Sequence, residues 1–374
     1  MTISETSSAL SLSRRVRRRV VDPMPFRPDA TVSVVIPCFN YAHYLPVAVA
    51  SVLSQEMVHV EVIIVDDASS DDSVAVARRL ARDSRVRVIT QPWNQGPVDT
   101  FNRGMAAASG EFLVRLDADD ALTSGSLARA VSAADAFPSA GLVYGRPKHF
   151  SGDVPLRMRT RVAAWRAWPG RDWLAARCAD GFNVITSPEV VMRRSVAMRA
   201  GGQRDLAHAH DMEMWFRLAA FADVVYVEGP DQAFHRDHPG SLSTRLATPL
   251  AEVKEKRAAF DLLFAGEAGD IPGAARMQAS AQAALARQAL RSAAHDYDRG
   301  RATSAGTDAY LDFAAETYPA IQHSAQWRRL SRRIALGQKR TRRRPQYTLI
   351  AAARRARDVL RQYRWLRHGT YSGD

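Results

Sequence analysis

Three aspartates, Asp117, Asp119 and Asp120, lie within four consecutive residues of the segment Val-Arg-Leu-Asp-Ala-Asp-Asp. The apolar run 112–114 before them has the pattern of a buried strand. Like charges this close repel and raise each other's pKa values unless a cation lies between them. Such a cluster at a strand end suits Mg²⁺ or Mn²⁺ holding a phosphate ligand. From these residues alone, an acidic turn that caps the next helix is the alternative.

The segments around this cluster alternate between predicted strands and predicted helices. Apolar and β-branched residues dominate 32–36, 60–65, 86–90 and 112–114, as expected for strands covered on both faces. The stretches between them carry apolar residues at helical spacing. This β-α-β-α-β-α-β alternation predicts a parallel sheet with right-handed crossovers.

Several polar and aromatic side chains follow these predicted strands directly. Phe39, Asp66, Asp67 and the acidic cluster at 117–120 each come at a strand's carboxyl end, where parallel sheets bind ligands. The chain has no G-x-G-x-x-G after its first strand and no G-x-x-x-x-G-K-[ST] motif. Without a glycine-rich cradle, nucleotide phosphates would need a metal, and the acidic cluster offers a place for one.

A second informative segment, 208–218, begins His-Ala-His-Asp and continues with helical periodicity. Asp211 suits either of two roles, the cap of this helix or a general base at the pocket edge. His208 and His210 suggest zinc, but no cysteine or third histidine has the spacing of a zinc site.

A third segment, Phe-His-Arg-Asp-His-Pro-Gly-Ser, starts at Phe234 after the predicted strand 224–227. It is either an ordinary loop of mixed charge or a functional one. In a functional loop, Arg236 would bind a diphosphate and His238 would add a ligand to the metal.

Composition bounds the class of protein. The 374 residues are 46% hydrophobic and 24% charged, as in soluble globular proteins. No window approaches the roughly 18 consecutive apolar residues of a membrane span. Residues 14–19 precede a stretch too short and too polar for a signal peptide. Cys38 and Cys178 fit a reducing compartment without a disulfide framework. We therefore expect a cytoplasmic protein.

The chain is expected to have three parts. Residues 1–29 are Ser-rich and then Arg-rich, which predicts a disordered basic arm. Residues 30–247 would form the catalytic domain, in which 146–172 is expected to be irregular with its two tryptophans in the core or an interface. Residues 248–374, rich in Ala, Leu, Arg and Glu at helical spacing, predict a helical extension.

The net charge of +13 resides in the tail, because residues 321–374 hold fifteen Lys and Arg against two Asp. Within this tail, 347–367 predicts a basic amphipathic helix with Leu349, Leu360 and Tyr363 on its apolar face. Such a helix docks on a membrane surface or a partner, or packs on its neighbours with solvated arginines. Nucleic-acid binding ranks lowest, since no recognised motif is present.

Six segments together resemble successive blocks of the family 2 glycosyltransferases, over residues 31–245. They are V-S-V-V-I-P-C-F-N-Y, V-D-D-A-S-S-D-D-S, N-Q-G-P, S-G-E-F-L-V-R-L-D-A-D-D-A-L, H-D-M-E-M-W-F-R-L and H-R-D-H-P-G-S-L-S. The resemblance implies a GT-A fold, a Rossmann-like and mostly parallel sheet flanked by helices. It also implies a nucleotide-sugar donor, a divalent metal (Mg²⁺ or Mn²⁺) and inversion at the anomeric carbon.

The resemblance assigns the nucleotide contacts. Pro37 and Phe39 would border the nucleoside, Asp67 or its neighbour Asp66 would hold the base or ribose, and Arg236 would contact the diphosphate.

The resemblance also assigns the metal and the base. Asp117 and Asp119 would be the D-x-D pair, with Asp120 as a direct metal ligand or Asp117 turned toward the ribose. His238 would complete the metal shell, and Asp211 would be the catalytic base.

Some features depart from the family pattern. The acidic pair expected at the base is His210-Asp211 here, and Ala-Arg-Asn is replaced by Thr-Phe-Asn at 100–102. No Q-x-x-R-W motif is present, which argues against a processive polysaccharide synthase. We expect transfer from a UDP-, GDP- or dTDP-sugar to a carbohydrate or lipid-linked acceptor, in cell-envelope or surface polysaccharide or glycolipid synthesis.

Two rival functions stay open. A sugar-1-phosphate nucleotidyltransferase would want a Gly-rich basic loop after the first strand, which 40–43 does not supply. A degenerate scaffold of the same fold is disfavoured by the intact acidic cluster and by Asp211. If the tail helix docks on a membrane, the protein would lie at the inner face of the plasma membrane.

Overall fold

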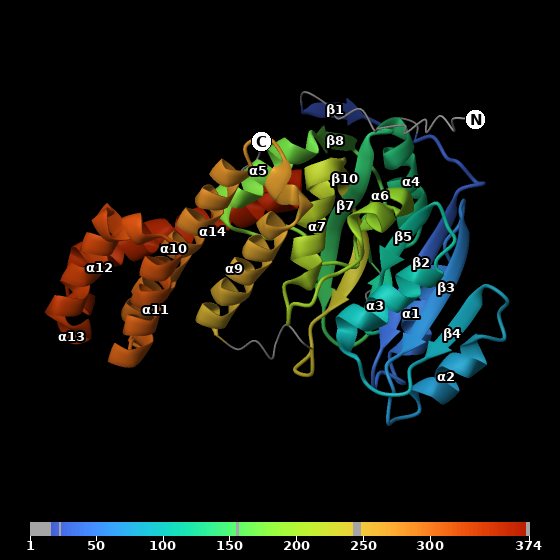
Figure 1. Ribbon diagram of the computed structural model, residues 1–374, viewed down its shortest axis with the longest axis horizontal. Helices are drawn as coiled ribbons and strands as arrows, with labels where there is room; N and C mark the ends of the chain where they lie inside the picture. Colours follow the sequence, from blue (N-terminus) through green and yellow to red (C-terminus); the bar gives the residue numbers. More distant parts are fainter. Residues whose placement is uncertain (1–15, 22–23, 155–156, 242–247, 372–374) are drawn as a thin grey trace, which may run out of the picture. The chain divides into compact units, whose positions relative to one another are not determined.

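The computed structural model describes residues 16–21, 24–154, 157–241 and 248–371 (Figure 1). The chain divides into two compact units. The first carries the sheet and consists of Met1–Trp173, Ile185–Gln203 and Met214–Arg236. The second is helical and consists of Leu174–Val184, Arg204–Glu213 and Asp237–Asp374.

The predicted parallel sheet is confirmed in the first unit. Its strands are β2 (Thr31–Cys38), β3 (His59–Asp66), β4 (Val86–Thr90) and β5 (Phe112–Arg115). They lie in the order β5-β2-β3-β4, and each neighbouring pair is parallel. Their carboxyl ends therefore meet at one edge of the sheet.

Helices cover both faces of this sheet. Helices α1 (Leu45–Leu53), α2 (Ser73–Leu80) and α4 (Ser126–Ala136) share one apolar cluster with Val34 and Ile64. Neighbouring residues of a strand point to opposite faces, so the rest of each strand needs a second cover.

Helix α3 (Gly96–Ala107) provides this second cover, and Gly104 explains its close approach. A Cβ atom at Gly104 would lie only 2.3 Å from a methyl carbon of Val35 and 3.0 Å from one of Val65. Strands β2, β3 and β5 are thus buried on both faces along most of their length, which is why their sequences are mostly apolar, whereas the edge strand β4 is more exposed.

The sheet continues where irregular structure was expected. β7 (Ala140–Phe150) and β8 (Ala164–Trp168) lie within or reach into 146–172, so that prediction is wrong for these residues. The two tryptophans, Trp165 and Trp168, are buried, which confirms their assignment to the core.

Two further strands join the halves of the sheet. β9 (Val191–Arg193) lies antiparallel between β5 and β7, and β10 (Asp223–Arg236) runs parallel to β7 and antiparallel to β8. Three helices complete this region: α5 (Gly170–Asp180), α6 (Arg194–Ala200) and α7 (His210–Phe221). The helix predicted from Asp211 is therefore confirmed as α7.

The N-terminal arm contains a strand. β1 (Arg17–Val20) pairs antiparallel with β8 at the sheet edge, so the expected disorder of residues 1–29 is wrong for this segment. Arg18 and Arg166 both bind the carboxylate of Glu228, at 2.7 and 3.0 Å. Residues 1–15 and 22–23 lie outside the described ranges.

The second unit is built around α10, as an all-helical region should be. Helix α10 packs against each of the other helices of the C-terminal extension and buries a row of alanines and leucines. The helices of this extension are α9 (Pro249–Ala265), α10 (Ala274–Arg299), α11 (Ser304–Thr317), α12 (Ala325–Leu336), α13 (Gln338–Arg342) and α14 (Pro345–His368). The short 3₁₀ turn Glu267–Asp270 lies between α9 and α10, and Pro319–His323 lies between α11 and α12.

The boundary predicted at 247 falls in 242–247, outside the described residues, whereas the change of unit comes at Asp237. Within the described ranges, every helix is too short or too polar to cross a membrane. Cys38 and Cys178 are both buried and free.

Candidate functional site

The acidic cluster forms a tight turn at the carboxyl end of β5. The backbone N–H of Asp120 donates to the carbonyl of Asp117 at 3.0 Å. The chain then enters the two-residue strand β6 (Ala121–Leu122), which pairs antiparallel with β10. This pairing places Asp120 beside His235 and Arg236, at the end of β10.

Asp120 is buried and bound on both carboxylate oxygens. Its Oδ1 accepts from the backbone N–H of Arg236 at 2.8 Å, and its Oδ2 lies 3.2 Å from Nδ1 of His235. Burial raises the pKa of Asp120 to about 6, although the contact with His235 opposes the rise. Burial would lower the pKa of His235, but the hydrogen bond and charge of Asp120 raise it to about 9. Each group of the pair thus favours the charged form of the other.

Arg236 clamps the acidic turn. Its buried side chain donates from Nε to the carbonyl of Asp119 at 2.9 Å and from Nη1 to the carbonyl of Gly152. Its guanidinium carbon lies 4.5 Å from the ring centre of Tyr44 and 4.4 Å from that of Phe150. These contacts give Arg236 a structural role, which is to hold the acidic turn in place. Its contact with a diphosphate stays a prediction.

Asp117 is the accessible member of the cluster. Its side chain is 36% exposed, and its Oδ1 accepts from the buried Arg115, 2.9 Å from Nη2. Arg115 also donates to Gln203 at 3.3 Å, which fixes its guanidinium in the core. The turn thus presents one partly exposed carboxylate, Asp117, which Arg115 binds through Oδ1, while Asp120 is bound on both oxygens.

Asp66 and Asp67 end β3, two strands away from the acidic turn. Asp67 accepts from the backbone N–H groups of Gln95 and Gly96, at 2.7 and 2.9 Å, and so fixes the start of α3. Asp66 accepts from the N–H of Ser69 through Oδ2. Its buried Oδ1 has no hydrogen-bond partner among the described residues. Asp66 therefore has an oxygen left for a ligand.

Exposed aromatic rings flank the end of β3. Phe39 follows β2 and is 44% exposed, and Trp93 follows β4 and is 66% exposed. Because β2 and β4 are the two neighbours of β3, the rings lie on either side of Asp66 in strand order. Pro37 is partly buried within β2, opposite Val65. Trp93 was not among the predicted site residues, although a large exposed aromatic after a strand is a usable signal.

The loop after β2 is locked to the loop after β3. Asn40 has the left-handed φ of 58° and accepts from the backbone N–H of Ser70 at 2.8 Å. The N–H of Asn40 donates to Ser69 at 2.9 Å. These bonds fix the backbone that carries Phe39, so the sheet edge is rigid on this side.

Glu189 is a buried acid that no sequence pattern indicated. Burial raises its pKa to about 7, although the N–H groups of Thr186 and Ser187 donate to it at 2.6 and 3.2 Å. Its charge adds to that of Asp120 in raising the pKa of His235. The carboxyl end of β10 is thus surrounded by acids.

Two predicted site residues belong to the second unit. Asp211 lies in the first turn of α7, where its Oδ1 accepts from the N–H of Met212 at 2.6 Å. The carbonyl of His238 accepts from the N–H of Ser241 at 3.1 Å, which forms a turn. The roles of base and metal ligand stay predictions for these residues.

Residues 33–200, which include the parallel strands and the acidic turn, match the model of the family described as Glycosyl transferase family 2. This segment of the chain belongs to glycosyltransferase family 2. Over 98 residues it is 41% identical to the GalNAc(5)-diNAcBac-PP-undecaprenol beta-1,3-glucosyltransferase of Campylobacter jejuni, covering 26% of this chain and 32% of that protein. The chain spans about a third of the length of the first curated relatives that it matches.

Two solved structures share the fold of this chain. One is S. aureus TarS 1–349 in complex with UDP-GlcNAc, with a TM-score of 0.53 and 15% identity over 78% of this chain and 92% of that one. The other is the mannosyltransferase PcManGT from Pyrobaculum calidifontis in complex with GDP-Man and Mn²⁺, with a TM-score of 0.53 and 18% identity over 88% of each chain. The predicted GT-A fold is confirmed.

Proposed function

We propose that this protein transfers a sugar from a nucleoside-diphosphate sugar to a hydroxyl acceptor, with inversion at the anomeric carbon. The observation that carries the proposal is the acidic turn, which β6 and β10 hold at the carboxyl edge of the parallel sheet. Family membership supports it, as do the nucleotide sugars bound by the two structural neighbours.

The donor nucleoside would lie at the end of β3. Asp66 offers an unused oxygen to the base or ribose, and Phe39 and Trp93 offer exposed rings to stack on the base. Pro37 borders the same edge. Asp67 positions α3 through its own hydrogen bonds, so we assign the ligand contact to Asp66.

The oxygen-donor set of the acidic turn fits a hard divalent cation such as Mg²⁺ or Mn²⁺. Asp117 and Asp119 would hold it, because Asp120 is bound to His235 and to the backbone of Arg236. His238 is the further ligand expected from the sequence. When bound, such a cation neutralises the charge that develops on the leaving diphosphate.

In this mechanism, Asp211 accepts the proton of the acceptor hydroxyl. The acceptor oxygen then attacks the anomeric carbon from the face opposite to the diphosphate, which inverts the configuration. Arg236 and the Asp120–His235 pair keep the turn rigid, so that its charges are in place before the reaction starts.

We further propose that α14 docks on an anionic membrane, where a lipid-linked acceptor would be found. Six of its large apolar side chains are 38% to 70% exposed: Leu349, Ile350, Val359, Leu360, Tyr363 and Leu366. Leu349, Leu360 and Tyr363 lie opposite to the buried Tyr347 and Trp365 on the helix surface.

The charges of α14 complement an anionic surface. The exposed Arg355, Arg357 and Arg364 flank the apolar stripe, Arg367 lies at its C-terminal end, and Asp358 is the only acidic residue of the helix. The Campylobacter relative is named for an undecaprenol-linked acceptor, which supports a lipid-linked acceptor and a place at the inner face of the plasma membrane.

A thermal-shift screen of UDP-, GDP-, dTDP- and CDP-sugars with Mn²⁺ or Mg²⁺ tests the donor. Ligand at one hundred times its Kd stabilises by about 2.7 kcal/mol, so one nucleotide class should raise the Tm clearly. Asp119→Asn should remove the metal-dependent part of this shift. Asp29→Asn, at the opposite edge of the sheet, should keep it. A metal-dependent shift that survives Asp119→Asn, or no shift for any donor, would contradict the proposal.

A further inference from the structure

Charged residues interrupt the packing interface, or seam, between α14 and α10. Tyr347 and Ala351 are buried at one end of α14, and Trp365 is buried at the other, where its indole N–H donates to the carbonyl of Val184 at 2.8 Å. At the matching helical spacing between them stand Arg354, Asp358 and Arg361. A packed helix seam normally places apolar side chains at such positions. Here the seam opens instead.

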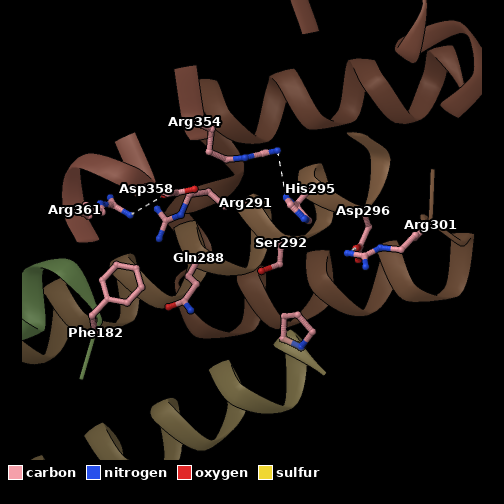
Figure 2. Close-up of a pocket in the computed structure, with 11 residues that line it drawn as sticks. Phe182, Gln288, Arg291, Ser292, His295, Asp296, Arg301, Arg354, Asp358 and Arg361 are labelled. Carbon is pink, nitrogen blue, oxygen red and sulfur yellow. Dashed lines mark hydrogen bonds and ion pairs between the residues drawn. The ribbon is translucent and has the colours of Figure 1, made fainter. Parts of the chain in front are cut away.

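The opening is a pocket of about 210 Å³ within the second unit (Figure 2). Arg291, Gln288 and Ser292 line it from α10, and Arg354 and Arg361 line it from α14. Phe182 forms its end wall, with the guanidinium carbon of Arg361 5.3 Å from the ring centre. The pocket therefore has an aromatic wall and polar hydrogen-bond donors on two helices.

The cations of this pocket are unequally paired. Arg354 binds the carboxylate of Asp298, and Arg361 lies 3.8 Å from that of Asp358. Arg291 makes no hydrogen bond or ion pair with any described residue, although it is half-buried. A guanidinium is costly to desolvate without a partner, so a bound anion would resolve the imbalance.

The electrostatics of the pocket agree with this picture. Burial lowers the pKa of Arg291 to about 10, and the charges of Arg361 and Arg287 lower it further in the same direction. Burial and then the charge of Arg354 lower the pKa of His295. Burial is thus the main cause that disfavours the charged forms of both groups. Neighbouring arginines add to it, and the carboxylates of Asp358 and Asp296 oppose it.

We propose that this pocket binds a phosphate or diphosphate group, with Arg291 as its main contact. Phosphate oxygens accept bidentate hydrogen bonds from guanidinium groups, and Gln288 and Ser292 add neutral donors. The volume suits one or two phosphoryl groups. The group belongs to a free anion or to a lipid headgroup. The residues of this pocket belong to the second unit and those of the acidic turn to the first, and the proposal does not depend on the proposed transfer reaction.

Isothermal titration of the full chain with inorganic diphosphate tests the pocket directly. Wild type should bind one equivalent, and Arg291→Gln should weaken binding at least tenfold. Arg276→Gln removes the same charge from an exposed position of α10 and should bind as wild type does. Arg291→Gln should also keep or raise the Tm, because it relieves repulsion. A purely structural role would lower the Tm and leave diphosphate binding unchanged.

Vesicles distinguish the two sources of the phosphate. If the group is a lipid headgroup, flotation with phosphatidylcholine vesicles containing phosphatidic acid should show weaker binding of Arg291→Gln than of wild type. If wild type and Arg291→Gln differ only in their binding of inorganic diphosphate, the ligand is a free anion. If the two proteins bind both diphosphate and the vesicles equally, the proposal is wrong. Binding of diphosphate should also raise the pKa of His295, which NMR titration would detect.

Discussion

Asp211 carries the proton transfer in the proposed reaction, and its residue type allows a sharp test. Asp211→Asn keeps an oxygen that can accept from the N–H of Met212, so the start of α7 should stay intact. The variant cannot take up a proton, and loss of a general base typically lowers turnover about 10²–10⁴-fold. We expect that loss in kcat, with donor affinity unchanged, when sugar transfer and donor binding are measured separately.

Asp205→Asn is the matched control, since Asp205 is exposed in the segment just before α7. It should leave both kcat and donor affinity as in wild type. If Asp211→Asn instead abolished donor binding or lowered the Tm, Asp211 would be a structural cap.

At the level of elements, β1 shows how a basic segment is fixed to a sheet edge. Burial would raise the pKa of Glu228, but hydrogen bonds from Arg18 and Arg166 lower it below its ordinary value. A lowered pKa in the folded state stabilises the fold above the unfolded pKa of about 4.3. That stability is lost as the pH falls through the lower folded value.

Arg18→Gln should therefore lower stability at neutral pH and reduce its loss on acidification. Arg18 is half-exposed, so we expect only about 1 kcal/mol, measured by urea unfolding at neutral pH and below the pKa. Arg19→Gln is the control, because Arg19 lies over the Trp165 ring and not beside a carboxylate. Equal effects of the two variants at both pH values would refute the role of Glu228.

The elements differ in how far their sequences predict them. Strands β2, β3 and β5 are largely apolar on both faces, and the edge strand β4 keeps the apolar Val86, Val88 and Ile89, so their composition indicates them directly. β8 was missed because Arg166 interrupts its apolar pattern. β1 was missed because its row of arginines matches a disordered arm, and its partner Glu228 is 210 residues away from Arg18.

The features of the candidate site also differ in how far the sequence predicts them. The acidic turn was predictable because clustered aspartates after an apolar run are a local signal. The clamp by Arg236 was not, because no local pattern tells that its guanidinium contacts the carbonyls of Asp119 and Gly152. The pairing of Asp120 with His235 likewise depends on β6 meeting β10.

At the scale of the whole molecule, the net charge of +13 and the exposed stripe of α14 point to a surface rather than to the proposed donor site. The double variant Leu349→Glu/Leu360→Glu should weaken binding to phosphatidylglycerol vesicles strongly. Burying one leucine contributes about 1.5–3 kcal/mol, so each loss corresponds to roughly tenfold or more. Vesicle co-sedimentation against vesicle concentration measures the effect.

Ala305→Glu adds one negative charge, half of that in the double variant, at an exposed position of α11 and should change vesicle binding little. Analytical ultracentrifugation of wild type and the double variant adds a second readout. If the wild type forms a dimer that the double variant cannot form, and vesicle binding is equal for both, then the stripe is a dimer interface. The membrane proposal would then fail.

The pairing of β6 with β10 also sets an order of events during synthesis. Residues Thr31–Arg115, which supply four parallel strands, leave the ribosome well before β10 does. Because chains fold from the N-terminus as they emerge, the parallel strands can assemble while Asp120 still lacks His235 and Arg236. The acidic turn therefore matures late, and a nascent chain that stalls before residue 233 would expose an unclamped acidic loop to chaperones and proteases.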